Sequence, residues 1–228
     1  MIDIMIKQYF LYILLAVATI FCYFWLSQFK KKLRIGEGKA FLIAVLHTVI
    51  GLLCVKLFAF IEGNAGGMSL YGGIFFMPVF YFVVSKLTKR NIADVFDIFA
   101  VCMVFTLLCA RVNCLRAGCC PGLPIPWMEG VCWPTREVEI LFYIILLAVL
   151  FKITGKPKYH GKIYPIYLVS YGIFRFIEEW FRDTTYPVKT FHISHIWSIV
   201  AVAIGIMVLC MISRKNKSGH KDRESKKL

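Results

Sequence analysis

Polar side chains recur along one face of an apolar stretch that ends near residue 182. Tyr171, Arg175, Glu179 and Arg182 follow one another at helical spacing, so at about 100° per residue they share one helical face. Two arginines held close together suit bidentate binding of a phosphate. The alternative is an interfacial anchor in which an Arg–Glu pair at i,i+4 reaches toward water.

Two further segments carry polar or small residues at the ends of apolar stretches. One runs Arg111-Val-Asn-Cys114-Leu-Arg-Ala-Gly118-Cys119-Cys-Pro-Gly122, and its glycines and proline predict a broken helix. The other contains Tyr71-Gly72-Gly73, where small residues allow close approach to a second helix or to a lipid head group. Helix packing alone is the alternative for this glycine pair. If the segments converge, the arginines could bind the phosphate of a lipid.

The composition indicates the environment that these residues occupy. Of 228 residues, 59% are hydrophobic and 18% are charged. Soluble domains are about 45–50% apolar and about 25% charged, so a soluble domain is excluded. The net charge of +14 suits nucleic acid or anionic lipid, and only lipid fits a largely membrane-spanning chain. We therefore predict an integral membrane protein with no nucleic-acid partner.

Seven stretches are apolar enough to be transmembrane helices, which need about 20 residues. They lie at 8–29, 39–61, 68–87, 92–111, 137–153, 163–182 and 192–212. The first lacks a basic segment and a cleavage site, so we expect it to be retained. The fold predicted is all-α, with one polytopic membrane domain over 1–212 and a basic, disordered tail over 213–228.

The distribution of positive charge predicts the orientation of these spans. Most of the 27 lysine and arginine residues fall in the first, third and fifth predicted loops and in the tail. Those parts are expected to be cytoplasmic, which places the N-terminus outside and the C-terminus inside. The basic residues on the opposite side, Arg111, Arg175 and Arg182 among them, break this bias, and buried charges in membranes usually mark a polar cavity.

At these residues the sequence resembles the prolipoprotein diacylglyceryl transferase family, from about residue 66 to 205. Tyr71-Gly72-Gly73 lies where the family has His-Gly-Gly. Arg111 to Gly122 matches the spacing of Gly-Arg-Ile-Gly-Asn-Phe-x-Asn-Gly-Glu-x-x-Gly, and Pro134-Thr135 with Glu139 resembles another family segment. The stretch from Tyr171 to Arg182 is close to the family pattern at every polar position, and Ser198 and Gly205 fit the final span.

The resemblance implies seven spans, a multi-pass protein of the bacterial inner membrane and an outward-facing site. It also implies transfer of the diacylglyceryl group of phosphatidylglycerol to the lipobox cysteine of a prolipoprotein, recognised with its signal peptide. By position, Arg111 and Arg175 would hold the phosphate and leaving group, Glu179 would orient an arginine, and Tyr171 and Arg182 would complete the cavity wall. Neither a cofactor nor a metal is expected.

The sequence departs from the family pattern at several of these positions. Tyr71 replaces the family histidine, and its ordinary pKa near 10 makes it a poor base at neutral pH. Cys114 and Cys119 replace an asparagine and a glutamate, and Arg136 replaces a glutamine. His195 stands at the position of a further glutamine, where it could supply a base or be a surface or capping residue. The expected catalytic set is Arg111, Arg175, Tyr71 and Glu179; the expected substrate-binding set is Gly72, Gly73, Cys114, Gly118, Cys119, Gly122, Tyr171, Arg182 and His195.

Four of the nine cysteines, Cys114, Cys119, Cys120 and Cys132, fall in or beside one predicted outward loop. Disulfides are the favoured interpretation, since an outward compartment permits them. Zinc is disfavoured because C-x4-C-C-x11-C lacks the usual close pairs and nearby histidines. A redox or acyl-carrying thiol and free structural thiols stay open.

Other classes of function are compatible with the same sequence. A divergent paralogue could act on another acceptor or lack catalysis. A transporter or scaffold would typically show internal repeats or helices broken near the midplane, and these signs are weak here. A thiol–disulfide enzyme would normally carry C-x-x-C, which is absent.

Overall fold

The computed structural model describes residues 2–63, 67–183 and 192–225, with side chains described between residues 9 and 214 of these ranges. Within them the fold is helical, and the few strand-like contacts are two isolated bridges in loops. The helices are α1 (Ile2–Gln28), α2 (Lys30–Leu33), α3 (Glu37–Ile61), α4 (Tyr71–Thr88), α5 (Ile92–Ala117), α6 (Thr135–Ile153), α7 (Ile163–Glu178) and α8 (Ile193–Ser225), with short 3-10 turns η1 (Pro157–Tyr159) and η2 (Glu179–Phe181).

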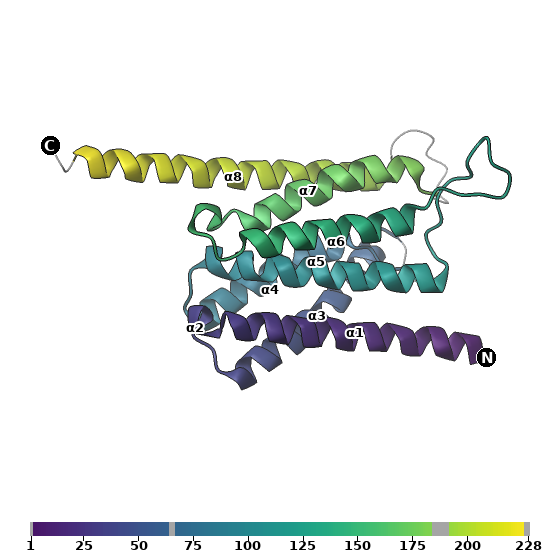
Figure 1. The fold of residues 1–228 in the computed structure, drawn as a ribbon, viewed down its shortest axis with the longest axis horizontal. Helices are drawn as coiled ribbons and strands as arrows, with labels where there is room; N and C mark the ends of the chain where they lie inside the picture. The colour runs from purple at the N-terminus through teal and green to yellow at the C-terminus, as the bar shows by residue number, and fades with distance from the viewer. Residues whose placement is uncertain (1, 64–66, 184–191, 226–228) are drawn as a thin grey trace.

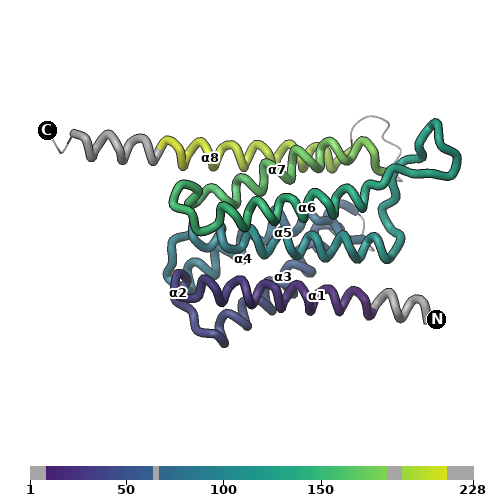
Figure 2. Tube along the Cα trace, in the orientation of Figure 1, coloured from purple at the N-terminus to yellow at the C-terminus, as the bar shows by residue number. Residues whose placement is uncertain are grey.

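The long helices lie side by side in one bundle, with α1 and α8 at opposite edges of the view (Figure 1). The trace in Figure 2 shows the connections alternating between the two ends of the bundle. We call the end where α5 and α7 finish, and where α4, α6 and α8 begin, the site end. The segment between α5 and α6 extends beyond the bundle there (Figure 1).

Five helical stretches are long and apolar enough to cross a membrane: Tyr9–Gln28, Glu37–Ile61, Tyr71–Thr88, Ile92–Ala117 and Ile193–Arg214. These confirm five of the predicted spans, to within a few residues at most ends. Helices α6 and α7 occupy the places of the other two. Helix α7 has only 16 residues, and α6 carries several charged residues. The count of seven spans and their orientation stay predictions.

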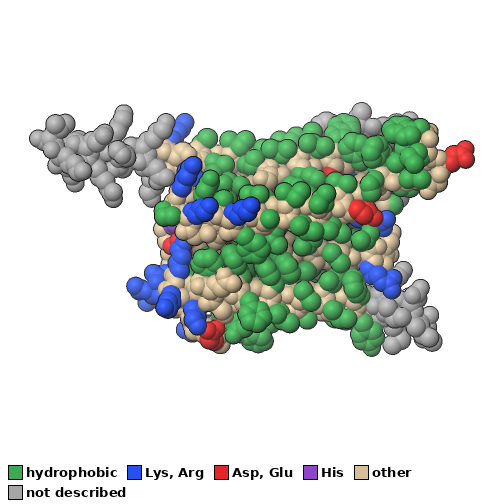
Figure 3. Space-filling view, in the orientation of Figure 1, with side chains coloured by type: hydrophobic (Ala, Val, Ile, Leu, Met, Phe, Trp, Pro, Cys, Tyr) green, Lys and Arg blue, Asp and Glu red, His purple; other side chains and the backbone are tan. Residues whose placement is uncertain are grey.

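Apolar side chains cover the long face of the bundle, as Figure 3 shows, and many large ones are exposed. Exposure of such a surface to water is unfavourable, whereas contact with lipid tails is not. Lysine and arginine side chains gather at the end opposite the site end (Figure 3). The described structure is therefore that of a membrane protein.

Two ends of helices differ from the sequence prediction. Helix α5 continues to Ala117, six residues beyond the predicted end of the span at 111, and Gly118 with φ +72° ends it, which confirms that a glycine of this segment breaks the helix. The backbone of α8 stays helical to Ser225, where a disordered tail was expected. Lysine, arginine and glutamate are good helix formers, so charge alone does not prevent a helix.

A buried carboxylate fixes α5 against α7 at the end opposite the site. The Asp97 carboxylate accepts hydrogen bonds from the backbone N–H groups of Gly161 at 2.5 Å and Ile163 at 2.9 Å. An anion at the first turn of a helix is favoured by the unpaired N–H groups there. This contact joins α5 to the start of α7 at the end of the bundle opposite Arg111 and Arg175.

Candidate functional site

A cavity of about 650 Å³ opens at the site end and continues between α1, α3, α4 and α5. Its polar end is lined by eight of the predicted site residues: Tyr71, Gly73, Arg111, Cys114, Tyr171, Arg175, Glu179 and Arg182. Its deeper part is mostly apolar, with side chains that include Leu15, Leu52, Val55, Met77 and Met103. One cavity thus joins a charged end to an apolar body.

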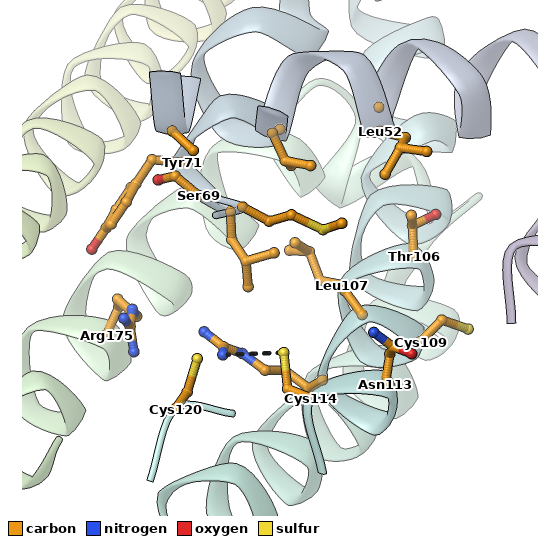
Figure 4. A pocket seen from close by; sticks show the side chains of 18 of the residues that line it. Leu52, Ser69, Tyr71, Thr106, Leu107, Cys109, Asn113, Cys114, Cys120 and Arg175 are labelled. Atoms are coloured by element: carbon orange, nitrogen blue, oxygen red, sulfur yellow. Dashed lines mark hydrogen bonds between the residues drawn. The ribbon is translucent and has the colours of Figure 1, made fainter. Parts of the chain in front are cut away.

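Arg111 is held by a carboxylate from the neighbouring helix. Its Nε lies 2.6 Å from the Glu139 Oε2 of α6, and both side chains are buried. The Tyr143 hydroxyl, one turn further along α6, donates to the other Glu139 oxygen at 2.9 Å. The terminal nitrogens of Arg111 have thiols for neighbours, with Nη1 3.9 Å from the Cys114 sulfur (Figure 4).

Arg175 is held by two carboxylates of its own helical segment. One terminal nitrogen is ion-paired with Glu178, and the other lies 2.8 Å from Glu179 Oε2. Glu179 also lies 3.7 Å from Arg182 Nη1 and 3.8 Å from His192 Nδ1. Glu179 is therefore the carboxylate around which three basic side chains gather.

Tyr71 connects α4 to α8 at the cavity wall. Its hydroxyl lies 2.8 Å from the backbone carbonyl oxygen of Ser194, to which it donates, and 2.8 Å from the Ser198 hydroxyl. The side chain is buried, and its ring meets Tyr171 edge-on at 6.0 Å between centroids. Tyr71 therefore lines the cavity and also joins α4 to α8 through its hydroxyl.

Loop segments converge on the cavity through backbone hydrogen bonds. Leu123 N donates to Phe181 O at 2.8 Å, and Asp183 N donates to Pro121 O at 3.0 Å. These bonds join the segment after α5 to the segment after α7. Cys120 and Arg182 consequently lie at one cavity, as the sequence analysis expected for the segments that carry them.

Five predicted substrate-binding residues do not line this cavity: Gly72, Gly118, Cys119, Gly122 and His195. A Cβ on Gly72 would lie 2.1 Å from the backbone oxygen of Cys54, so this glycine allows α3 and α4 to pack closely. Gly122 is equally close to the Trp133 backbone. For Gly72, helix packing was the alternative that the sequence left open.

His195 is buried beside the cavity instead of facing it. Its ring meets Phe176 and Trp180 edge-on, and its Nδ1 accepts a hydrogen bond from the backbone N–H of His192 at 3.1 Å. This contact at the start of α8 is a capping arrangement, one of the alternatives considered from the sequence.

Sequence reasoning missed several polar contacts. Glu178 and Glu139 were not among the expected site residues, although they pair with Arg175 and Arg111, and Ser198 was noticed only through the family resemblance. Tyr143 was missed entirely. Its spacing of four residues from Glu139 was the one available signal, because residues i and i+4 share a helical face.

The expected disulfides are wrong for this structure, because all nine cysteines are free thiols. The sulfur atoms of Cys114, Cys119 and Cys120 lie within 4.8 Å of one another, and Cys132 is not part of this group. Hydrogen bonds from the Cys114 and Cys119 thiols, with help from Arg111, lower the pKa of Cys120. Figure 4 shows Cys114 and Cys120 directed toward the space that Tyr71 and Arg175 also face.

The same chain matches one protein family over nearly its whole length. Residues 1–211 match the family described as prolipoprotein diacylglyceryl transferase. The chain belongs to this family. Membership confirms the resemblance found at the arginine segments, and it fits the apolar helices, because this is a family of bacterial inner-membrane proteins.

Individual relatives agree with this assignment. A protein of Clostridium novyi is 25% identical over 172 residues, covering 68% of this chain and 67% of that protein. A protein of Clostridium tetani is 23% identical over 210 residues, covering 80% of this chain and 84% of that protein. A protein of Mannheimia succiniciproducens is 32% identical over 128 residues, covering 52% of this chain and 48% of that protein. Each is named phosphatidylglycerol–prolipoprotein diacylglyceryl transferase.

Proposed function

We propose that the protein transfers the diacylglyceryl group of phosphatidylglycerol to the thiol of a prolipoprotein cysteine. In that reaction the thiol sulfur forms a bond to the diacylglyceryl carbon that carries the phosphate. The bond from that carbon to the phosphate oxygen breaks, and the other glycerol leaves as glycerol phosphate. The thiol proton is released as the bond forms. The observation that carries the proposal is that one cavity has buried arginines at one end and a mostly apolar part behind them.

The two ends of the cavity match the two parts of a phospholipid. Acyl chains fit the apolar part between α1, α3, α4 and α5, since transfer of apolar surface from water is favourable. The phosphate fits beside Arg111, which has one ion pair among the described residues, with Glu139, and whose Nη1 lies beside the Cys114 sulfur. Guanidinium groups aimed at a departing phosphate stabilise the charge that it gains.

The carboxylates have a positioning role in this proposal. Glu139 and Tyr143 hold the Nε side of Arg111 and so direct its terminal nitrogens toward the cavity. Glu179 holds Arg175 and Arg182 together at the opposite wall. Tyr71 and Tyr171 complete the wall between them.

We further propose seven spans, with the site end facing outward. The gathering of lysine and arginine at the opposite end supports this orientation, because cytoplasmic loops are enriched in these residues. Cys132, an exposed thiol in the α5–α6 segment, gives a direct measurement. A membrane-impermeant maleimide added to intact cells is expected to label Cys132 in a variant whose other cysteines are replaced by serine. Labelling only after lysis would contradict the orientation.

The transfer is tested with purified protein in vesicles that contain phosphatidylglycerol and a peptide spanning a prolipoprotein signal sequence and its cysteine. Mass spectrometry is expected to show addition of one diacylglyceryl group to the peptide. Arg111→Ala is expected to lower turnover about 10²–10³-fold, the usual cost of removing one group that stabilises a transition-state charge. Arg116→Ala is the matched control, since Arg116 is exposed in the last turn of the same helix.

Three outcomes of that assay are informative. Full turnover by Arg111→Ala and by Arg175→Ala would overturn the assignment of the phosphate site. Turnover of the lipid without addition to the peptide would point to another acceptor. Absence of any lipid turnover, in protein whose insertion and folding are verified, would contradict the proposed reaction.

A further inference from the structure

We propose that Cys114, Cys119 and Cys120 form a binding site for one thiolate-binding d10 cation, Cu⁺ or Zn²⁺, at the edge of the cavity. Metal binding does not depend on the transfer reaction, although Cys114 and Cys120 line the same cavity as Arg111. It uses side chains that stand where the family signature has other residue types at two of the three positions. Its basis is the approach of three sulfur atoms from the end of α5 and the segment that follows.

The spacing of the sulfurs is close to what one ion requires. All three Sγ atoms lie within 4.8 Å of one another. Metal–sulfur bonds of about 2.3 Å place ligand sulfurs about 3.8–4.0 Å apart in tetrahedral or trigonal geometry. Side-chain rotation alone can supply the small closure that remains.

The backbone turns in a way that brings the thiols together. Cys114 lies in the last turn of α5, and Gly118 ends the helix with φ +72°. Cys120 then adopts φ +57°, a conformation that residues other than glycine seldom adopt. The two reversals return the chain toward α5, and the Cys119 sulfur comes to 3.7 Å from the Cys114 carbonyl oxygen.

One positive charge beside the thiols, that of Arg111, favours the thiolate form, which is the form that binds metal. Arg111 Nη1 lies 3.9 Å from the Cys114 sulfur, and the Arg111 guanidinium also interacts with Cys120. Each thiol that binds the ion gives up its proton to water. The positive charge of Arg111 offsets part of the negative charge that three thiolates add to one Cu⁺ or Zn²⁺.

The number and exposure of the thiols distinguish this site from a disulfide. One bridge within a group of three would leave an odd thiol, whereas a trigonal site uses all three. Thiolate ligands select Cu⁺ and Zn²⁺ over the harder cations. Cys119 is exposed, so an ion can enter without passing the buried arginines. Zn²⁺ would complete four-coordination with water, and Cu⁺ would be satisfied by the three sulfurs.

The proposal is tested on the full chain, purified in detergent, reduced and handled without oxygen. One equivalent of Cu⁺ or of Zn²⁺ is added in separate experiments, unbound ion is removed, and bound metal is measured by elemental analysis. The expected result is one ion per chain, with X-ray absorption showing three sulfur ligands at about 2.2–2.3 Å. Comparison of the two ions in competition shows which one the site prefers.

Single substitutions identify the ligands. Cys119→Ser and Cys120→Ser are expected to weaken binding at least tenfold, whereas Cys132→Ser and Cys210→Ser, which alter exposed thiols outside the group, should bind as the parent does. Bound ion should also protect Cys114, Cys119 and Cys120 from iodoacetamide while Cys132 reacts. Cys119→Ser changes an exposed side chain and so keeps the test available if Cys120→Ser fails to fold.

Several results would overturn the proposal. One is retention of no more metal by the parent than by a variant with all three cysteines changed to serine. Another is equal loss of binding in Cys132→Ser. A third is a disulfide between any two of the three cysteines that persists under the reducing conditions used for loading.

Discussion

The two buried arginines at the site end are held in different ways. Arg111 has its carboxylate, Glu139, on another helix, and that carboxylate is itself fixed by Tyr143. Arg175 has both of its carboxylates, Glu178 and Glu179, within four residues of itself. Arg111 is positioned by the packing of α5 against α6, whereas the local helix positions Arg175.

The difference assigns different parts to the two side chains. Carboxylates occupy both terminal nitrogens of Arg175, so this side chain is held as a fixed part of the cavity wall. Arg111 has one carboxylate partner among the described residues, closest to its Nε, and its Nη1 lies beside the Cys114 thiol at the cavity. An incoming phosphate oxygen competes with one carboxylate at Arg111 and with two at Arg175.

Glu139→Gln is expected to have the largest effect on stability. It leaves the Arg111 guanidinium buried with no carboxylate among its described neighbours, and loss of one partner of a buried pair costs about 3–5 kcal/mol. Unfolding of the purified protein by heat or denaturant in detergent measures the change. Transfer activity should fall as well, since Arg111 loses the contact that orients it.

A double substitution shows whether the cost arises from the unpaired charge. Glu139→Gln with Arg111→Gln removes both charges and should recover a large part of the lost stability, although not the activity. If the free energy of unfolding of Glu139→Gln lies within about 0.5 kcal/mol of that of the parent, the contrast between the two arginines is wrong.

The contrast also explains how much of the site could be predicted from the sequence. The i,i+4 relation of Arg175 and Glu179 follows from helical spacing, and the structure confirms the pair at 2.8 Å. The Arg111–Glu139 pair joins two helices, and no local pattern specifies which residues of different helices meet. The resemblance to the family pointed to both segments but not to their contact.

Prediction of the helices had the same limit. Long apolar runs predicted the existence of α1, α3, α4, α5 and α8 but not the C-terminal ends of α5 and α8, since membrane helices must satisfy their own backbone hydrogen bonds. The cluster of three thiols from Cys114, Cys119 and Cys120 depends on two residues of a loop that have left-handed backbone conformations, Gly118 and Cys120. Hydropathy does not determine such a turn, and disulfides were expected in its place.

Glu179→Gln and Glu178→Gln sharpen the comparison from the other side. Each leaves Arg175 with one carboxylate, so each is expected to cost less than Glu139→Gln, about 1–3 kcal/mol by the same unfolding measurement. Glu179→Gln should lower turnover more than Glu178→Gln, because only Glu179 lines the cavity and lies near Arg182 and His192. Equal activity of the two variants would remove the special role given to Glu179.

Tyr71→Phe separates a structural contact from a chemical one. The variant loses the hydroxyl that donates to Ser194 O and lies beside the Ser198 hydroxyl, at an expected cost of about 0.5–1.5 kcal/mol. Turnover measured in the vesicle assay should stay within about tenfold of the parent. A fall of about 10²–10⁴-fold, with unchanged folding, would instead show that the hydroxyl acts in proton transfer.

Arg182→Ala is expected to have the smallest effect on stability. Its side chain is partly exposed, and Nη1 is 3.7 Å from Glu179 Oε2, so the pair contributes at most about 1 kcal/mol. Because Arg182 lines the cavity, the change should raise the phosphatidylglycerol concentration needed for half-maximal turnover more than it lowers the maximal rate. Titration of phosphatidylglycerol in neutral-lipid vesicles measures both quantities. If the maximal rate falls as far as it does in Arg111→Ala, then Arg182 shares the part assigned to Arg111, and the division between a receiving arginine and a fixed wall does not hold.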